Sequence, residues 1–313
     1  MATQSPVRVV LMFVGLFTFI AAIVLNSLSA FGAQSVVFRQ STEDLTLKYA
    51  TPITPAEWTL FLWDFIYLWL SAMFIYFLVG LCRRSAYDWM YTTPAVLPYG
   101  FHVSIIINVC LNITWLFLLD RELLLPGLIT SVLLMFTEYM ILFFSCHGLK
   151  IYGAWLNKYH NADLWLIRVL VQNGVAVYAT MGTLLTLLNL TMYLQHQTGT
   201  SRCDCAKLSL LLLLMKLSAW FLLENFYFDE HVRYIVTIYP VVILWQAAIL
   251  INSNSPEHQV YIFAASILAI SSAMFVARIG LVTWRHYKRP LYRASGPSLS
   301  PIEIALTQRK IFL

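Results

Sequence analysis

The chain has 313 residues, of which 60% are hydrophobic and 11% are charged, and its formal net charge is +5. A soluble domain usually carries about 25% charged residues, so this composition excludes an ordinary soluble protein. The positive charge does not indicate a nucleic-acid partner, because the basic residues gather at the ends of apolar segments and in the C-terminal tail. Since an open sheet leaves backbone groups unpaired in lipid, the sequence predicts an all-α bundle of membrane-spanning helices.

Eight apolar segments are long enough to span a bilayer, which takes about 20 helical residues. They cover residues 8–28, 58–82, 101–119, 125–146, 164–194, 206–226, 234–252 and 260–284. The first segment has a second interpretation as a cleavable signal peptide, because Arg8 precedes its apolar run and the small residues Ser27 and Ser29 follow it. Cleavage would leave seven spans and an N-terminus outside the cytoplasm.

The distribution of lysine and arginine predicts the orientation, since cytoplasmic loops are enriched in these residues. Eleven lie on one side of the predicted spans and five on the other. An even number of spans then places both termini in the cytoplasm, in a multi-pass protein of the plasma membrane or an endomembrane. The cytoplasmic set is Arg83, Arg84, Lys150, Lys158, Arg233, Arg285, Lys288, Arg289, Arg293, Arg309 and Lys310, and the opposite set is Arg39, Lys48, Arg121, Arg202 and Lys207.

Two segments outside the spans are long enough to have a role of their own. Residues 30–55 form a non-cytoplasmic connection, and connections of this length are uncommon unless they act as lids or are disordered. Residues 285–313 form a basic cytoplasmic tail, which anionic membrane lipid would attract by about 1 kcal/mol per basic residue. Membrane lipid is therefore the expected partner, and assembly into a homo-oligomer is left open.

Ionisable side chains within spans are costly, by about 2.5–3.5 kcal/mol each, so each is expected to face a partner or a cavity. We expect Glu138 to neutralise Arg168 from another helix. Lys216 and Glu224 lie two turns apart, so both should point into the bundle. Alternatively, Arg168 and Arg278 lie near a boundary and reach the headgroups. The full set is Asp64, Glu138, Arg168, Lys216, Glu224 and Arg278.

Uncharged polar residues follow the same helical spacing. In the second span Asp64, Tyr67 and Ser71 share one face, and in the third span Asn108, Asn112 and Trp115 do so. These faces predict a site, but amides in spans also bond neighbouring helices, at about 0.6 kcal/mol each. That structural interpretation is favoured for Asn108 and for Gln172 and Asn189 of the fifth span.

The sequence contains no motif of a soluble enzyme. A glycine-rich phosphate loop, a G-x-S-x-G elbow and an H-E-x-x-H zinc site are all missing from it. Its seven histidines have no metal-ligand spacing. We therefore expect a protein that is not an enzyme and that has no metal or cofactor.

Three short motifs occur in order on the second, third and fifth spans. The second span opens with P-A-E-W at 55–58 and continues with W-D-F-I-Y at 63–67, the third holds L-N-I-T-W at 111–115, and the fifth ends with L-N at 188–189. In these motifs the chain resembles the TspO/translocator family of tryptophan-rich sensory proteins. The resemblance covers residues 8–195, which is five spans, and residues 206–284 are three additional spans without a counterpart in it.

The resemblance implies a cavity among the first five helices that binds a planar hydrophobic ligand, a porphyrin or a sterol, with the first loop closing its mouth. The residues that would face this cavity are Trp63, Tyr67, Asn112, Trp115 and Asn189. The chain departs from the family pattern in two places, because tandem prolines are missing between Trp58 and Trp63, and Met181 stands where the family often has tryptophan. Both departures fall where a ligand would lie.

Three functions remain open on this basis. The leading hypothesis is a receptor or carrier for a planar hydrophobic ligand, and a weak sterol-recognition pattern, Val282, Tyr287 and Arg289, also occurs at the end of the last span. The second is an ion- or proton-coupled channel or secondary transporter, in which the six charged residues line a polar path. The third is a structural membrane protein that binds a partner.

Overall fold

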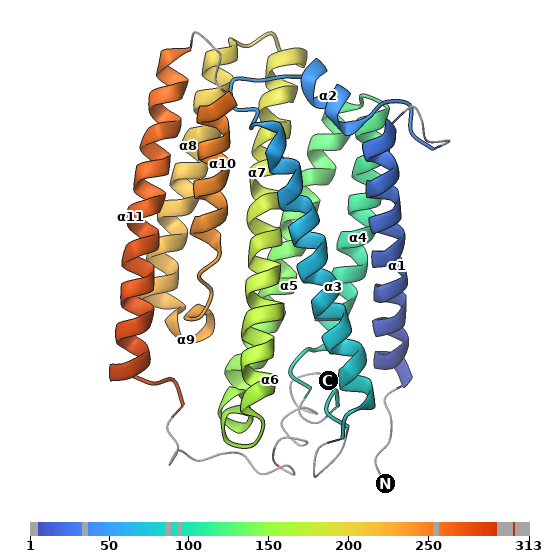
Figure 1. Cartoon of the computed structure of the whole chain (residues 1–313), viewed down its shortest axis with the longest axis vertical. Helices are drawn as coiled ribbons and strands as arrows, with labels where there is room; N and C mark the ends of the chain where they lie inside the picture. Colours follow the sequence, from blue (N-terminus) through green and yellow to red (C-terminus); the bar gives the residue numbers. More distant parts are fainter. Residues whose placement is uncertain are drawn as a thin grey trace.

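The computed structural model describes residues 6–32, 37–84, 89–92, 95–252, 257–292 and 303. This part of the chain is helical and contains no strand, apart from one isolated bridge between Arg84 and Trp89. The helices stand side by side as an upright bundle (Figure 1). The all-α membrane bundle predicted from composition is confirmed.

Some helical segments follow one another without a break and form one continuous helix. When each continuous helix is counted once, seven are long and apolar enough to cross a membrane within the described part of the chain. They are α1 (Pro6–Phe31), α3 (Leu60–Cys82) with its leading turn η2 (Glu57–Thr59), α4 (Tyr99–Asp120), α5 (Leu124–Tyr159), the joined helix α6 (Asn161–Leu166), η3 (Ile167–Asn173) and α7 (Gly174–Gln197), the joined helix α8 (Arg202–Leu222) and η4 (Leu223–Tyr227), and α11 (His258–Lys288). The segments η3 and η4 are π-helical.

The seventh predicted span is shorter than expected. It forms α10 (Ile238–Asn252), a helix of 15 residues, after the one-turn helix α9 (Asp229–Val232). Residues 235–237 are not helical, and the Asn173 side chain accepts from the Val236 N–H (3.1 Å) and the Thr237 hydroxyl (3.2 Å). Such non-helical backbone is tolerated at membrane depth where protein surrounds it. The helix therefore starts at Ile238 and not at the predicted residue 234, after a short non-helical segment that Asn173 holds.

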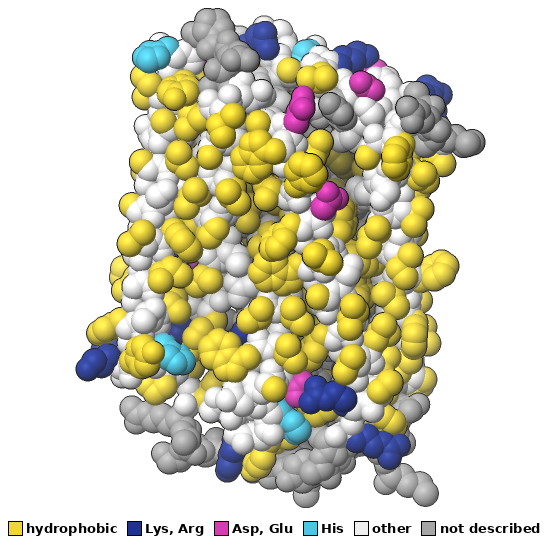
Figure 2. Space-filling view, viewed as in Figure 1, with side chains coloured by type: hydrophobic (Ala, Val, Ile, Leu, Met, Phe, Trp, Pro, Cys, Tyr) yellow, Lys and Arg dark blue, Asp and Glu magenta, His cyan; other side chains and the backbone are white. Residues whose placement is uncertain are grey.

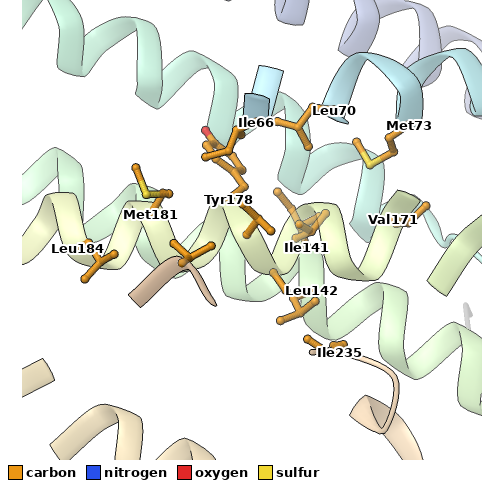
Figure 3. Packing of buried hydrophobic residues seen from close by; sticks show 14 of the residues in the cluster. Ile66, Leu70, Met73, Ile141, Leu142, Val171, Tyr178, Met181, Leu184 and Ile235 are labelled. Carbon is orange, nitrogen blue, oxygen red and sulfur yellow. The ribbon is translucent and has the colours of Figure 1, made fainter. Parts of the chain in front are cut away.

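The helix α7 lies at the centre of the bundle and contacts α3, α5, α8 and α10. Of the most apolar stretch of the joined α6–α7 helix, 83% is buried, against 22–39% for the other candidate spans. Figure 3 shows Tyr178, Met181 and Leu184 of α7 within the packed core, with side chains of α3 and α5 around them. The helix α7 therefore joins the first five spans to the added ones.

The connection after α1 lies across one end of the bundle, where the short helix α2 (Thr42–Lys48) rests (Figure 1). The backbone N–H groups of Arg39 and Gln40 donate to the Asp120 carboxylate, at 2.7 and 3.2 Å. Glu122, in the turn between α4 and α5, accepts from the side chains of Gln40, Lys48 and Tyr49. Both acidic groups fix this connection to the end of α4.

The same connection also reaches the added helices. The carbonyl of Ala50 accepts from Gln195 and Arg202 at the facing ends of α7 and α8, each at 3.3 Å. The Asn252 amide, at the end of α10, donates to the Thr54 carbonyl at 3.1 Å. Residues 37–56 therefore tie the first five spans and the last three together at one end of the bundle.

Charge is distributed along the bundle axis as in a membrane protein. On the face in Figure 2, hydrophobic side chains cover the middle, and most charged side chains lie towards the two ends. The start of α1 and the end of α11 lie at the same end of the bundle (Figure 1). Multi-pass integration is confirmed, and the cytoplasmic location of that end stays a prediction. Arg293, Arg309 and Lys310 of the predicted tail lie outside the described residues.

Candidate functional site

The first five spans enclose a small cavity, which we call the five-helix cavity. It has a volume of about 30 Å³, enough for one or two water molecules. Of the five predicted ligand-binding residues, Tyr67 and Asn112 line it. Its full lining is Phe19, Ala22, Tyr67, Leu70, Met73, Phe74, Ile105, Asn108, Val109, Asn112, Ile141, Val175 and Tyr178.

The prediction that all five residues face one cavity is wrong, because the other three lie elsewhere. Trp63 packs its ring against Tyr67 and Tyr178, with centroids 6.3 and 6.4 Å apart. Trp115 belongs to a separate cluster with Phe38, Leu116 and Leu134. Asn189 is buried but does not line the cavity. Helical spacing predicted that Trp63 and Trp115 face a cavity. In the structure Trp63 packs on the Tyr178 ring, and Trp115 packs with Phe38 of the first connection.

The amides of the third predicted span hold helices together. Asn108 donates to the Thr137 hydroxyl at 2.8 Å and accepts from the Tyr178 hydroxyl at 2.8 Å, which links α4 to α5 and α7. Asn112 accepts from Asn26 of α1 at 3.1 Å. Both amides at the five-helix cavity therefore already have protein partners.

Glu138 does not pair with Arg168, so that prediction is wrong. The Glu138 carboxyl group is buried and packs against Gly182 of α7, and the charge that acts on it electrostatically is Lys216. Arg168 is instead surrounded by the rings of Tyr234, Trp165 and Tyr292, at 3.9, 4.9 and 5.7 Å from their centroids. Cation–π attraction stabilises a guanidinium group in such surroundings without a carboxylate.

Three further charged residues are placed clearly. Glu224 and Arg278 are fully buried and form an ion pair, with Arg278 Nε 3.5 Å from the carboxylate. Arg278 also donates to the Asn225 side chain (2.9 Å) and to the Val232 carbonyl (2.8 Å), so it is not a snorkelling residue. Asp64 is exposed in the second turn of α3 and does not point into the bundle, contrary to the prediction.

A much larger hollow lies where the added helices meet the first five spans, and we call it the junction pocket. Its volume is about 300 Å³. It is lined from α5, α7, α8 and α10, with Leu223 from the start of η4, and its walls are mostly apolar. The lining residues are Tyr139, Leu142, Ala176, Ala179, Thr180, Thr183, Leu184, Leu213, Lys216, Leu217, Ala219, Trp220, Leu223, Ile238 and Val242.

A polar cluster crosses the wall of the junction pocket. The Tyr139 and Thr183 hydroxyls are hydrogen-bonded at 2.8 Å, and the Lys216 ammonium donates to the Thr183 hydroxyl at 3.0 Å. Lys216 Nζ also lies 4.5 Å from the centroid of the Tyr139 ring and 3.1 Å from the Met135 sulfur. The expectation that Lys216 points into the bundle is thus met, as it is for Glu224.

Sequence reasoning missed the junction pocket because its lining comes from helices far apart in the chain. A signal was nevertheless present in the small residues that recur on α7 between positions 174 and 183, since small residues let helices approach closely. They are Gly174, Ala176, Ala179, Thr180, Gly182 and Thr183. Among the described residues, no group of three or more histidine, cysteine or acidic side chains is placed to hold a metal ion.

Fold and pocket together define a multi-pass helical membrane protein with an intramembrane hydrophobic pocket. A family model described as TSPO-like protein matches residues 12–278, so the chain belongs to the TSPO-like family. This match extends through α8 and α10 and most of α11, and is not confined to the first five spans. No curated protein and no solved structure gives a significant match.

Proposed function

We propose that this protein is a membrane receptor or carrier for a hydrophobic ligand of the porphyrin or sterol kind, and that the junction pocket holds the ligand. The observation that carries the proposal is the size and lining of this pocket. Ligand sites usually measure about 300–1,000 Å³ and have apolar walls with a few polar groups, and the junction pocket has both properties. The five-helix cavity has about a tenth of this volume.

Membership of the TSPO-like family supports a ligand-binding role, because the family resemblance implies porphyrins and sterols as ligands. The channel or transporter hypothesis has less support, since its six charged residues lie in four separate places. Asp64 is on the surface, Glu138 and Lys216 lie between α5, α7 and α8, Arg168 is among aromatic rings, and Glu224 pairs with Arg278.

Tryptophan fluorescence tests the proposal, because Trp220 lines the junction pocket. The purified full chain is titrated with protoporphyrin IX, followed by quenching, and with the fluorescent sterol dehydroergosterol, followed by energy transfer. We expect saturable binding of at least one of them. Ala179→Phe, which fills the pocket, should weaken that binding about tenfold or more, since loss of one well-packed apolar contact is worth about 1–3 kcal/mol.

Trp63→Phe and Trp115→Phe are the matched controls, because neither tryptophan lines the junction pocket. Both variants should bind as the parent does. Absence of saturable binding with both ligands would overturn the proposal. Unchanged affinity in a folded Ala179→Phe variant would remove the junction pocket as the site.

A further inference from the structure

The environment of Lys216 is unusual for an ammonium group. The side chain is half-buried at the wall of a mostly apolar pocket, in the middle of α8 (Arg202–Leu222). A charge in such surroundings is costly unless an opposite charge or several hydrogen bonds compensate it. The atoms around Lys216 therefore indicate what kind of group the pocket can receive.

The partners of Lys216 within the protein are neutral. Its ammonium group donates to the Thr183 hydroxyl and lies against the Met135 sulfur, which is a weak acceptor. Among the described residues, no carboxylate oxygen lies within 4.0 Å of Lys216 Nζ. Glu138 attracts Lys216 electrostatically, and its carboxyl group packs against Gly182 of α7. Within the described part of the chain, the ammonium group therefore has one oxygen acceptor, one weak sulfur acceptor and the face of the Tyr139 ring, but no carboxylate that could neutralise its charge at short range.

The pocket is also accessible from the side of the bundle. Two of its lining residues, Ala219 and Leu223 on the α8–η4 helix, are exposed. In the bilayer this surface faces lipid, so an apolar molecule could enter laterally. The walls beyond Lys216, formed by Leu213, Leu217 and Val242, are apolar and suit the body of such a molecule.

We propose that the junction pocket selects an apolar molecule that carries an acidic group, and that Lys216 binds the carboxylate of this ligand. This inference rests on the proposed function and names the chemical class of its ligand. Lys216 offers the charge, and the Tyr139 hydroxyl beside it can turn from Thr183 and donate to the second carboxylate oxygen, whereas the Thr183 hydroxyl donates to the Ala179 carbonyl. Charge-assisted hydrogen bonds of this kind are about twice as strong as neutral ones. A neutral ester or alcohol of the same shape lacks this contact.

The experiment compares each acid with its own ester, so that the apolar body stays constant. The purified full chain is titrated with protoporphyrin IX and its dimethyl ester, and separately with oleic acid and methyl oleate. We expect the acid to bind about tenfold more tightly than the ester in a pair that binds. This comparison uses the unmodified protein and does not depend on the folding of any variant.

Three variants then locate the preference. Lys216→Met should lower the acid-to-ester ratio to about twofold or less, with the ester affinity nearly unchanged. Lys216→Arg should keep most of the preference, because the positive charge remains. Lys207→Met, on the same helix but bound to Gln259 outside the pocket, should behave as the parent does.

Several results would overturn the inference. Equal affinities of acid and ester would show that the pocket does not distinguish the acidic group from its ester. The proposed binding of a hydrophobic ligand would still stand. A preserved preference in Lys216→Met would place the acidic group elsewhere. Absence of saturable binding by both members of both pairs would overturn this inference, and the proposed function would fall with it only if dehydroergosterol also failed to bind.

Discussion

At the scale of single residues, Glu138 and Gly182 form one of the closest fits in the bundle. A Cβ atom on Gly182 would collide with both oxygens of the Glu138 carboxyl group. The carboxyl group can therefore lie between α5 and α7 because residue 182 has no side chain. Gly182 has helical geometry, so close approach rather than backbone conformation explains the glycine.

Gly182→Ala should lower the thermal unfolding temperature of the protein in detergent. Overpacking of a buried site costs about 1–3 kcal/mol, which exceeds the gain of about 0.5–1 kcal/mol from replacing a helical glycine by alanine. In the background of Glu138→Ala the same substitution should cost little, because the colliding group is gone. Gly80→Ala is the control, since no atom lies within 4 Å of its added Cβ. Equal effects at positions 80 and 182 would contradict this explanation.

The charged residues show why partner assignments from sequence are unreliable. The sequence indicates that Arg168 needs compensation, but it cannot show that Tyr234 and Tyr292, more than 60 positions later, supply it with their rings. Conversely, Glu224 and Arg278 form a buried ion pair, but in the sequence they are two charges far apart, with nothing to indicate that they meet. Burial demands a partner, and only the packing of helices decides which one.

At the scale of elements, hydropathy identifies the apolar part of each helix but not its ends. The fourth predicted span covers residues 125–146, whereas α5 continues to Tyr159, because a helix can extend beyond the hydrocarbon where polar residues are solvated. The opposite error occurs at α10, which starts later than predicted. The π-helical segment η4 begins at Leu223, which lines the junction pocket, and η3 ends at Asn173, shortly before Ala176, the first lining residue of α7. Such segments often mark functional sites.

The first connection provides a pH-dependent prediction. Hydrogen bonds from Lys48, Gln40 and Tyr49 lower the pKa of Glu122 from its ordinary value of 4.5 to about 2. Because the pKa of Glu122 is lower in the folded protein, its contribution to holding α2 in place is complete above about pH 4.5. That contribution is lost as the pH falls towards about 2.

Amide hydrogen exchange of residues 42–49 measures this effect as protection factors corrected for intrinsic rates. We expect protection to be lower at pH 3 than at pH 6 in the parent protein. Glu122→Gln should already show low protection at pH 6 and change less with pH. A parent whose protection is the same at both pH values would contradict the assignment of Glu122 as the anchor.

At the scale of the whole molecule, composition and three motifs were sufficient to predict the class and the family. The all-α bundle followed from the cost of unpaired backbone in lipid, and the motifs at 55–67, 111–115 and 188–189 indicated the family. The main cavity could not be predicted in this way. It arises between α5, α7, α8 and α10, and no single helix carries a pattern that reveals its volume.

The orientation of the bundle is a prediction of the same scale. The first residues of α1 and the last residues of α11 lie at the same end of the bundle (Figure 1). By sequence, the segments at this end are the ones rich in lysine and arginine. Tags at the two ends of the chain should therefore both be accessible to protease from the cytoplasm. Tags protected on opposite faces would contradict an even number of crossings.

The central claim is that the ligand site lies at the junction of the first five helices with the added ones. An experimental density map of the full chain saturated with protoporphyrin IX tests it most directly. The account predicts ligand density among α5, α7, α8 and α10, beside Trp220, with an acidic group at Lys216. Ligand density among Phe19, Tyr67 and Tyr178 in an expanded five-helix cavity, with the junction pocket filled only by lipid, would contradict it.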